Sequence, residues 1–174
     1  RPGAGCGRDR RRFVRAVGLD LGSKRIGVAL SNSEGTLATP YDTVERSGDI
    51  ARDHRAIKAL VEEAEAEIVV IATPWDGAAT VAQENADHLD GKVVISMANA
   101  LVRVNSEFQP LVPPRGSVAA HVQAAVPRCR LVAAFHHLPA AELGNIDDPI
   151  DSDVLVCGDD RAAVSDVSDI VARI

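Results

Sequence analysis

The first residue whose type and position could do chemistry is Asp20, which follows the short apolar run Val14–Leu19 and precedes a turn at Gly22. A carboxylate at the end of a strand can hold a divalent metal ion, because the strand fixes it and the small glycine lets a phosphodiester approach the backbone. Lys24 and Arg25 could hold the phosphates beside it. The alternative role for the aspartate is a turn residue that caps a hairpin.

Further candidates follow three apolar runs in the second part of the chain. The runs and the residues after them are Ile68–Ala72 with Thr73, Pro74 and Trp75, Val93–Met97 with Asn99, and Leu131–Phe135 with His136, His137 and Leu138. In open α/β sheets ligands lie beyond the carboxyl ends of the strands, so these residues would converge on one crevice. A neutral histidine there could donate a hydrogen bond to a carbonyl group of a cofactor.

Simpler roles are open for the same residues. The tryptophan could pack as a lid on the helix that follows it, and a histidine could be hydrogen-bonded within its own loop. Because adjacent side chains on an extended segment point to opposite sides, His136 and His137 are not expected to share a metal ion.

The elements that would position these residues alternate between strand and helix. Besides the apolar runs, strands are expected at Ile26–Leu30, as a hairpin with the first run, at Leu37–Val44 and at Asp153–Cys157. Helices are expected at Asp49–Glu65, Thr80–Leu89, Ser117–Val126 and Ala162–Arg173, and a long loop at Asn99–Arg115. The alternation predicts an α/β fold with a mostly parallel sheet.

Composition excludes several classes of protein. The chain has 174 residues, 46% hydrophobic and 25% charged, which is typical of a globular domain and not of a disordered or collagen-like chain. No apolar run approaches the ~20 residues that span a bilayer. The three cysteines form no CxxC pair, so neither a disulfide framework nor a zinc knuckle is expected. We therefore expect a cytoplasmic protein without a membrane partner.

Charge is distributed unevenly along the chain. Residues 1–66 hold 12 Lys and Arg against 10 Asp and Glu, whereas residues 67–174 hold 7 against 15. This asymmetry indicates either two sequence histories or a basic tail on an acidic domain. The acidic part argues against a broad nucleic-acid surface there, because phosphate binding needs clustered Lys and Arg.

The run GLDLGSKRIGVALS, followed by TLATPYDTVER, resembles the start of the Holliday-junction-resolvase-like nucleases, also described as pre-16S rRNA processing nucleases, of the RNase H fold. The resemblance covers about residues 16–71 and implies that Asp20 binds a catalytic Mg²⁺ or Mn²⁺ and that a nucleic acid is the substrate. The family's later DER-like motif is not found after residue 75. Asp159, Asp160 and Asp166 are available acids, but their surroundings do not match the family.

A second resemblance covers about residues 67–174. The runs IVVIATPWDGAATVAQENADHLDGKVVISMANALVRV, PPRGSVAAHVQAAVP, VAAFHHLPAAEL and SDVLVCGDD resemble the NADPH-dependent reductases of the deazaflavin coenzyme F420. The resemblance implies a Rossmann-type domain that moves hydride between NADP and the deazaflavin. By the same resemblance Thr73, Pro74 and Trp75 would border NADP, His136 and Leu138 would lie near the two rings, and Asn99 would lie in the same crevice.

The two resemblances together indicate a chimera. We expect a basic, disordered lead-in at residues 1–15, an RNase H-like fragment at 16–66 and a Rossmann-like reductase fragment at 67–174, with the join near Ala66–Ile71 and the two parts able to pack as one domain. No GxGxxG is present, so hydride transfer is expected to be impaired. A metal-dependent nuclease acting through Asp20 and an inactive remnant are the alternatives. Small-molecule coenzymes are the expected partners, nucleic acid only under the nuclease alternative, and the sequence allows a homodimer.

Overall fold

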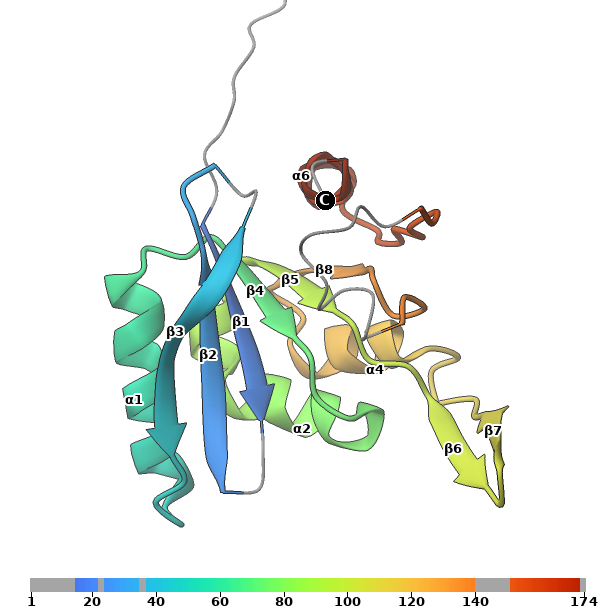
Figure 1. Ribbon diagram of the computed structural model, residues 1–174, viewed down its shortest axis with the longest axis horizontal. Coiled ribbons are helices and arrows are strands. Elements are labelled where there is room, and N and C mark those ends of the chain that lie inside the picture. Colours follow the sequence, from blue (N-terminus) through green and yellow to red (C-terminus); the bar gives the residue numbers. More distant parts are fainter. Residues whose placement is uncertain (1–14, 22–23, 35–36, 140–150, 173–174) are drawn as a thin grey trace, which may run out of the picture.

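The computed structural model describes residues 15–21, 24–34, 37–139 and 151–172. Its central element is an open six-stranded sheet (Figure 1). The strand order is β3-β2-β1-β4-β5-β8. The strands are β1 (Ala16–Leu21), β2 (Arg25–Ser31), β3 (Ala38–Glu45), β4 (Ile68–Ile71), β5 (Val93–Ser96) and β8 (Arg130–Ala133). Strands β1, β4, β5 and β8 are parallel, and β2 and β3 are antiparallel neighbours. The predicted α/β class with a mostly parallel sheet is confirmed.

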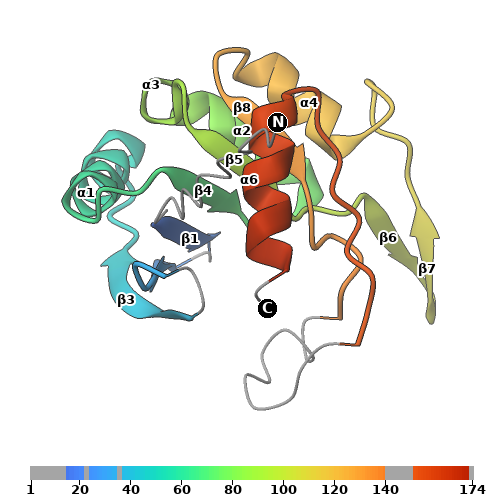
Figure 2. The same ribbon diagram turned by 90° about the horizontal axis from the view of Figure 1, so that it is seen from above.

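Helices cover both faces of this sheet. They are α1 (Ile50–Glu63), α2 (Trp75–Glu84), the short α3 (Ala86–Leu89), α4 (Val118–Ala125) and α6 (Arg161–Val171). Figure 2 shows α6 on one side of the sheet and the other helices on the opposite side. The longest of these helices has 14 residues, and none of the described helices has both the length and the apolar character needed to cross a bilayer.

The central strands are apolar on both faces because both faces are covered. In β4, Val69 and Ile71 belong to a core formed with α2 and α4, whereas Ile68 belongs to a separate core under α6. In β5, Val94 faces the first core and Ile95 the second. Such two-sided burial explains why these strands are continuous apolar runs in the sequence.

The two parts of the sequence share one sheet. Strand β1 pairs with β4 in parallel register, with Val17 opposite Val69, and Leu19 packs against the cores of both parts. The strand order is that of a dinucleotide-binding sheet, but β2 and β3 run antiparallel to their neighbours instead of being joined by crossover helices. The hairpin-forming segment therefore occupies the place of the first βαβ unit.

Two expected elements are wrong. The region Asn99–Arg115 is not a plain loop, because it holds the antiparallel strands β6 (Leu101–Val104) and β7 (Glu107–Pro110), joined at Asn105 in a left-handed conformation with φ 58°. The prolines of this region favoured the prediction of a loop, although only one of them lies in a strand, at the end of that strand. Conversely, Asp153–Cys157 is not a regular strand: Cys157 makes one isolated antiparallel bridge to Ala133.

Other differences concern where elements begin and end. Helix α2 begins at Trp75, five residues before the predicted start at Thr80, since Pro74 serves as its N-cap residue and Gly77 is tolerated in its first turn. Asp20 lies within β1, opposite Gly27, and does not terminate the strand. The cap of α4 agrees with the prediction, because the Ser117 hydroxyl accepts a hydrogen bond from the Ala120 N–H at 3.0 Å.

Candidate functional site

The carboxyl ends of β4, β5 and β8 lie at one edge of the sheet. Their registers place Ile71 beside Ser96 and Ser96 beside Ala133, so the chain leaves all three strands at the same level. The residues predicted to form a crevice come directly after these positions. The three strand ends therefore lie level at one edge of the sheet, as the sequence predicted.

Asn99 and His136 are brought together across two of these strand ends. The Asn99 Nδ2 donates a hydrogen bond to the main-chain oxygen of His136 at 3.2 Å, across 37 positions of sequence. On the other side of the loop, the His137 Nε2 lies 2.8 Å from the main-chain oxygen of Asp153. The loop after β8 is thus held from both sides, and the two imidazole rings meet edge to face with centroids 5.2 Å apart.

The environment of His136 favours its neutral form. Burial lowers the pKa of the half-buried His136 below 6.5, and the neighbouring His137 lowers it further. Its Nδ1 atom is buried and has no hydrogen-bond partner among the described residues. A neutral imidazole of this kind can give or accept one hydrogen bond without bringing a charge into the site.

Two buried hydroxyl groups lie at the same edge. The side chains of Thr73 and Ser96 are 5% and 1% exposed, and neither hydroxyl oxygen has a partner within the described part of the chain. Buried hydroxyls without a partner are uncommon, and a bound water molecule or a ligand can satisfy them. Ser96 was missed by sequence reasoning, because it lies inside an apolar run and carries no motif.

The remaining predicted residues are distributed over both faces of the sheet. Trp75 is half-buried at the start of α2 and packs on the core shared by α2 and α4. Leu138 packs on the core under α6, on the opposite face. Pro74 is exposed as the N-cap residue of α2. The structure therefore unites Asn99 with His136 but places Trp75 and Leu138 on different sides of the strand ends.

Asp20 lies at the corresponding end of β1, with an exposed side chain. Asp160 caps α6 by accepting a hydrogen bond from the Ala163 N–H, and the Asp166 carboxylate of α6 lies 4.0 Å from the Arg130 guanidinium of β8. In the parts of the chain that the structure describes, no three His, Cys, Asp or Glu side chains lie together as metal ligands would. The described residues do not fit a two-metal nuclease site, which needs several converging carboxylates.

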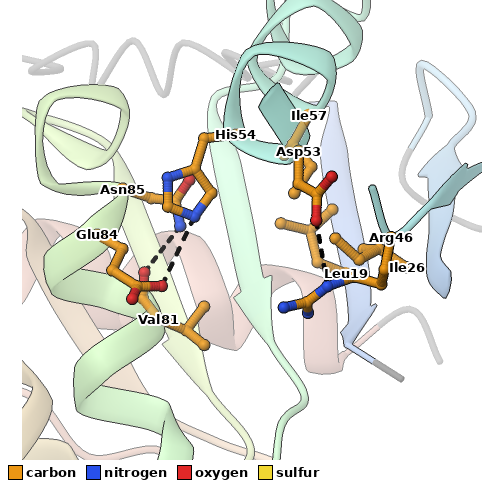
Figure 3. A pocket seen from close by; sticks show the side chains of 9 residues that line it. All are labelled: Leu19, Ile26, Arg46, Asp53, His54, Ile57, Val81, Glu84 and Asn85. Carbon is orange, nitrogen blue, oxygen red and sulfur yellow. Dashed lines mark hydrogen bonds and ion pairs between the residues drawn. The ribbon is translucent and has the colours of Figure 1, made fainter. Parts of the chain in front are cut away.

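A pocket that the sequence did not indicate lies between α1 and α2, over β1 and β2. Figure 3 shows the polar side chains that reach into it from the two helices and from the end of β3. Its lining residues are Leu19, Ile26, Arg46, Asp53, His54, Ile57, Val81, Glu84 and Asn85. No spacing rule could have found it, because His54 and Glu84 are 30 positions apart and meet only through the packing of two helices.

The family described as RuvX, Holliday junction resolvase, matches residues 14–104, which is just over half of the chain. The chain belongs to this family. The match runs well past residue 71, where the nuclease resemblance was expected to end, and includes β4, α2 and β5. A protein of Mycobacterium sp. strain KMS described as a pre-16S rRNA nuclease is 47% identical over 75 residues, covering 42% of this chain and 41% of the relative.

Reductases match a different and overlapping part. The F420-dependent NADP reductase of Methanocaldococcus jannaschii is 32% identical over 112 residues, covering 63% of this chain and 50% of the relative. A crystal structure described as an F420-dependent NADP reductase from Arthrobacter sp. FB24 superposes with a TM-score of 0.54 at 22% identity, covering 71% of this chain and 54% of that one. The latter shows the fold alone. Both resemblances predicted from the sequence are confirmed, as in a chimera, and the chain spans half or less of these two curated relatives' lengths.

Proposed function

We propose that the carboxyl edge of β4, β5 and β8 binds NADP and the deazaflavin coenzyme F420, and that the chain acts in hydride transfer between them. The observation that carries this proposal is the hydrogen bond from Asn99 to His136, which joins two of the three predicted strand ends. The reductase of Methanocaldococcus jannaschii supports the choice of coenzymes, since its name states both.

The residues fit the ring end of such a coenzyme pair. His136 offers a neutral imidazole with an unpartnered Nδ1 among the described residues, and Thr73 and Ser96 offer hydroxyls in the same condition. Thr73, Pro74 and Trp75 would border NADP, and Leu138 would contact the rings from the α6 side. When bound, the two coenzymes supply the hydride donor and acceptor themselves.

The residues do not fit the phosphate end in the usual way. In a dinucleotide-binding sheet the first strand leads into a helix whose N-terminus binds the pyrophosphate. Here β1 leads into the antiparallel strand β2. We therefore propose weak coenzyme binding and slow turnover, because charge-assisted hydrogen bonds of about 1.5–3 kcal/mol each would be missing.

In this proposal the protein's own groups position the rings and exclude water. Asn99 holds the loop after β8 by its hydrogen bond to the main-chain oxygen of His136, at 3.2 Å. His136 then gives or accepts one hydrogen bond at a coenzyme carbonyl or amide while remaining uncharged. Trp75 and Leu138 close the two apolar sides of the strand ends.

The test is fluorescence titration of the full chain with NADPH and, separately, with F420. We expect saturation with both, weakened roughly five- to tenfold in Asn99→Ala, which removes the hydrogen bond to the main-chain oxygen of His136, and in His136→Ala, which removes the proposed hydrogen bond to the coenzyme, since such bonds are worth about 1–1.5 kcal/mol. The matched control is His88→Ala, which alters a histidine on α3, the helix that precedes the amino end of β5. No saturable binding of either coenzyme at millimolar concentration would refute the proposal.

A second candidate function is binding or cleavage of nucleic acid at Asp20. Membership of the resolvase family and the exposed position of Asp20 at the carboxyl end of β1 favour it. Among the described residues no three His, Cys, Asp or Glu side chains lie together as metal ligands, so we derive no metal-dependent step. A Mg²⁺- or Mn²⁺-dependent nick in branched DNA or precursor rRNA that is lost in Asp20→Asn would establish this function in place of the first.

A further inference from the structure

The hairpin of β6 and β7 exposes most of the large apolar side chains that reach solvent in the described part of the chain. Six of the nine lie between residues 101 and 112, namely Leu101, Val102, Val104, Phe108, Leu111 and Val112. Phe108 is 68% exposed and Val112 is 84% exposed. Single exposed apolar residues are ordinary, whereas a contiguous group of them marks an interaction surface.

The hairpin stands apart from the main sheet. Figure 1 and Figure 2 both show it projecting from the body of the molecule. Strands β6 and β7 form a sheet of their own, and all of their residues are exposed. An isolated two-stranded hairpin is at best marginally stable in water, and a third strand stabilises it. The described residues of the chain provide no such strand.

The hydrogen-bond pattern of the hairpin leaves the outer edge of β6 unpaired. The Leu111 N–H donates to the Ala100 oxygen at 2.8 Å, just before β6 begins. Because such bonds fall on alternate residues of an antiparallel pair, Val102 also turns its main-chain groups toward β7. Leu101 and Arg103 turn theirs to the outer edge, where no other strand pairs within the described ranges.

This edge of β6 suits a pairing strand better than the outer edge of β7 does. Pro110 of β7 lies opposite Leu101, at an outward position, and proline has no N–H to offer there. On β6 the Leu101 N–H already donates to the Asn99 oxygen at 2.9 Å, so the edge offers the Leu101 oxygen and both main-chain groups of Arg103. A donor at Arg103 and an acceptor two residues before it match the same strand of a second copy turned by a two-fold axis.

The charge of the hairpin also favours a second copy as the pairing strand. Residues 99–112 carry one positive charge, Arg103, and one negative charge, Glu107, whereas the whole chain has a net charge of −6. Two copies can therefore approach through this neutral segment with less repulsion than through the acidic remainder of the chain. Two-fold pairing would also set Val102 opposite its own counterpart, and β-branched pairs across strands stabilise a sheet.

We propose that the outer edges of β6 from two copies of this chain pair antiparallel about a two-fold axis at Val102, so that the two hairpins form one four-stranded sheet. A standard interface buries about 800 Å² per partner over about 20–30 residues. On that scale residues 101–112 of each copy would bury roughly 400 Å², which is typical of weak, reversible association. This dimer does not rest on the proposed coenzyme site.

The test is sedimentation velocity of the full chain, without coenzymes, from micromolar to millimolar concentration. We expect a reversible shift from monomer to dimer. Val102→Lys sets two like charges opposite each other and should weaken the dimer at least about tenfold. The matched control is Leu155→Lys, which adds the same charge at an exposed apolar residue outside the hairpin and should leave dimerisation unchanged.

A second pair of variants tests the main-chain pairing itself. Arg103→Pro removes the outward N–H and should weaken the dimer at least about tenfold, while the hairpin stays paired, because Pro110 already occupies an outward position on β7. Arg103→Ala keeps the N–H and should dimerise like the original chain. A chain that stays monomeric at millimolar concentration would overturn the proposal and leave the hairpin to a different protein. Equal dimerisation of Arg103→Pro and Arg103→Ala would place the dimer contact elsewhere and refute the pairing.

Discussion

The two parts of the chain differ in how their candidate chemistry is supported. In residues 16–66 the candidate is a single exposed carboxylate, Asp20, on a strand that forms an antiparallel hairpin. In residues 67–172 the candidates lie at the ends of three parallel strands, and two of them are joined by a hydrogen bond. A local motif can thus be present although a complete site needs residues from other strands.

What the parts share is the sheet. The pairing of β1 with β4 and the contacts of Leu19 with two cores connect them more directly than a linker would. Strand β4 with its flanking helix and strand fits either family, because both the resolvase and the reductase matches include it. A join at β4 can therefore preserve local structure on both sides.

The largest expected effect tests whether the two parts unfold together. Ile26→Ala in the first part and Ile95→Ala in the second each empty a fully buried site, 1% and 2% exposed, and should each lower the free energy of unfolding by about 2–5 kcal/mol. Trp75 is the single tryptophan and lies in the second part. If the sheet is one cooperative unit, Ile26→Ala will shift the Trp75 fluorescence midpoint as much as the far-ultraviolet circular dichroism midpoint.

The contrary result is also specific. If Ile26→Ala shifts only the circular dichroism midpoint and leaves the tryptophan transition in place, the parts unfold separately. Leu155→Ala serves as a control, since that side chain is 57% exposed and its truncation should change stability by about 0.5 kcal/mol or less.

A smaller effect concerns the close approach of the segment before α6 to the edge strand β8. A Cβ atom at Gly158 would lie 2.8 Å from the Leu131 main-chain oxygen and 3.1 Å from a Val164 methyl group. Gly158→Ala should therefore destabilise the chain by about 1–3 kcal/mol, measured by urea unfolding. Gly77→Ala is the matched control, because a Cβ there meets nothing within 4 Å and alanine favours the helix. Equal stability of the two variants would contradict this contact.

Much of this fold could be predicted from local pattern. Apolar runs located β4, β5 and β8, and the Ser117 cap located α4, because burial on both faces and helix capping leave direct marks in sequence. The hairpin β6–β7 was missed since its residues are all exposed and it has no buried face to produce a periodic pattern.

The candidate sites likewise divide into residues that the sequence could locate and contacts that it could not. The strand-end residues could be found because the carboxyl edge of a parallel sheet is fixed by topology. The opposite placement of Trp75 and Leu138 could not, because the face that a loop residue meets depends on packing. The contact between His54 and Glu84 arises from the crossing of two helices, which no spacing in the chain records.

A still smaller and pH-limited effect is expected at Asp53, which anchors the start of α1. Hydrogen bonds from the Ser47 N–H and, second, from the Ser47 hydroxyl lower the pKa of Asp53 below 3.8. The Arg46 charge also lowers this pKa, and burial opposes these effects. The stabilisation is therefore present above pH 3.8 and is lost as the pH falls through the lower folded value. Asp53→Asn should lower the urea midpoint at neutral pH and reduce its fall in acid. As a control, Asp87→Asn changes a side chain that is 91% exposed and should leave the neutral urea midpoint and its fall in acid nearly unchanged. An equal fall of the urea midpoint in acid for Asp53→Asn and the original chain would contradict the stabilising role of Asp53.

The smallest effect is expected at His136 and separates the proposed coenzyme edge from the rest of the sheet. Because burial lowers its pKa below 6.5, the folded chain binds fewer protons there than the unfolded chain does. Stability is then complete above pH 6.5 and declines as the pH falls below it through the folded value. Urea midpoints between about pH 5 and pH 7 should fall less steeply in His136→Asn than in the original chain. His137→Asn should give an intermediate slope, since the imidazole of His137 is the second cause of the lowered pKa and its ring lies 5.2 Å away. A slope unchanged in both variants would mean that the loop after β8 does not keep His136 neutral, and the case for an uncharged imidazole at the coenzyme rings would then fail together with it.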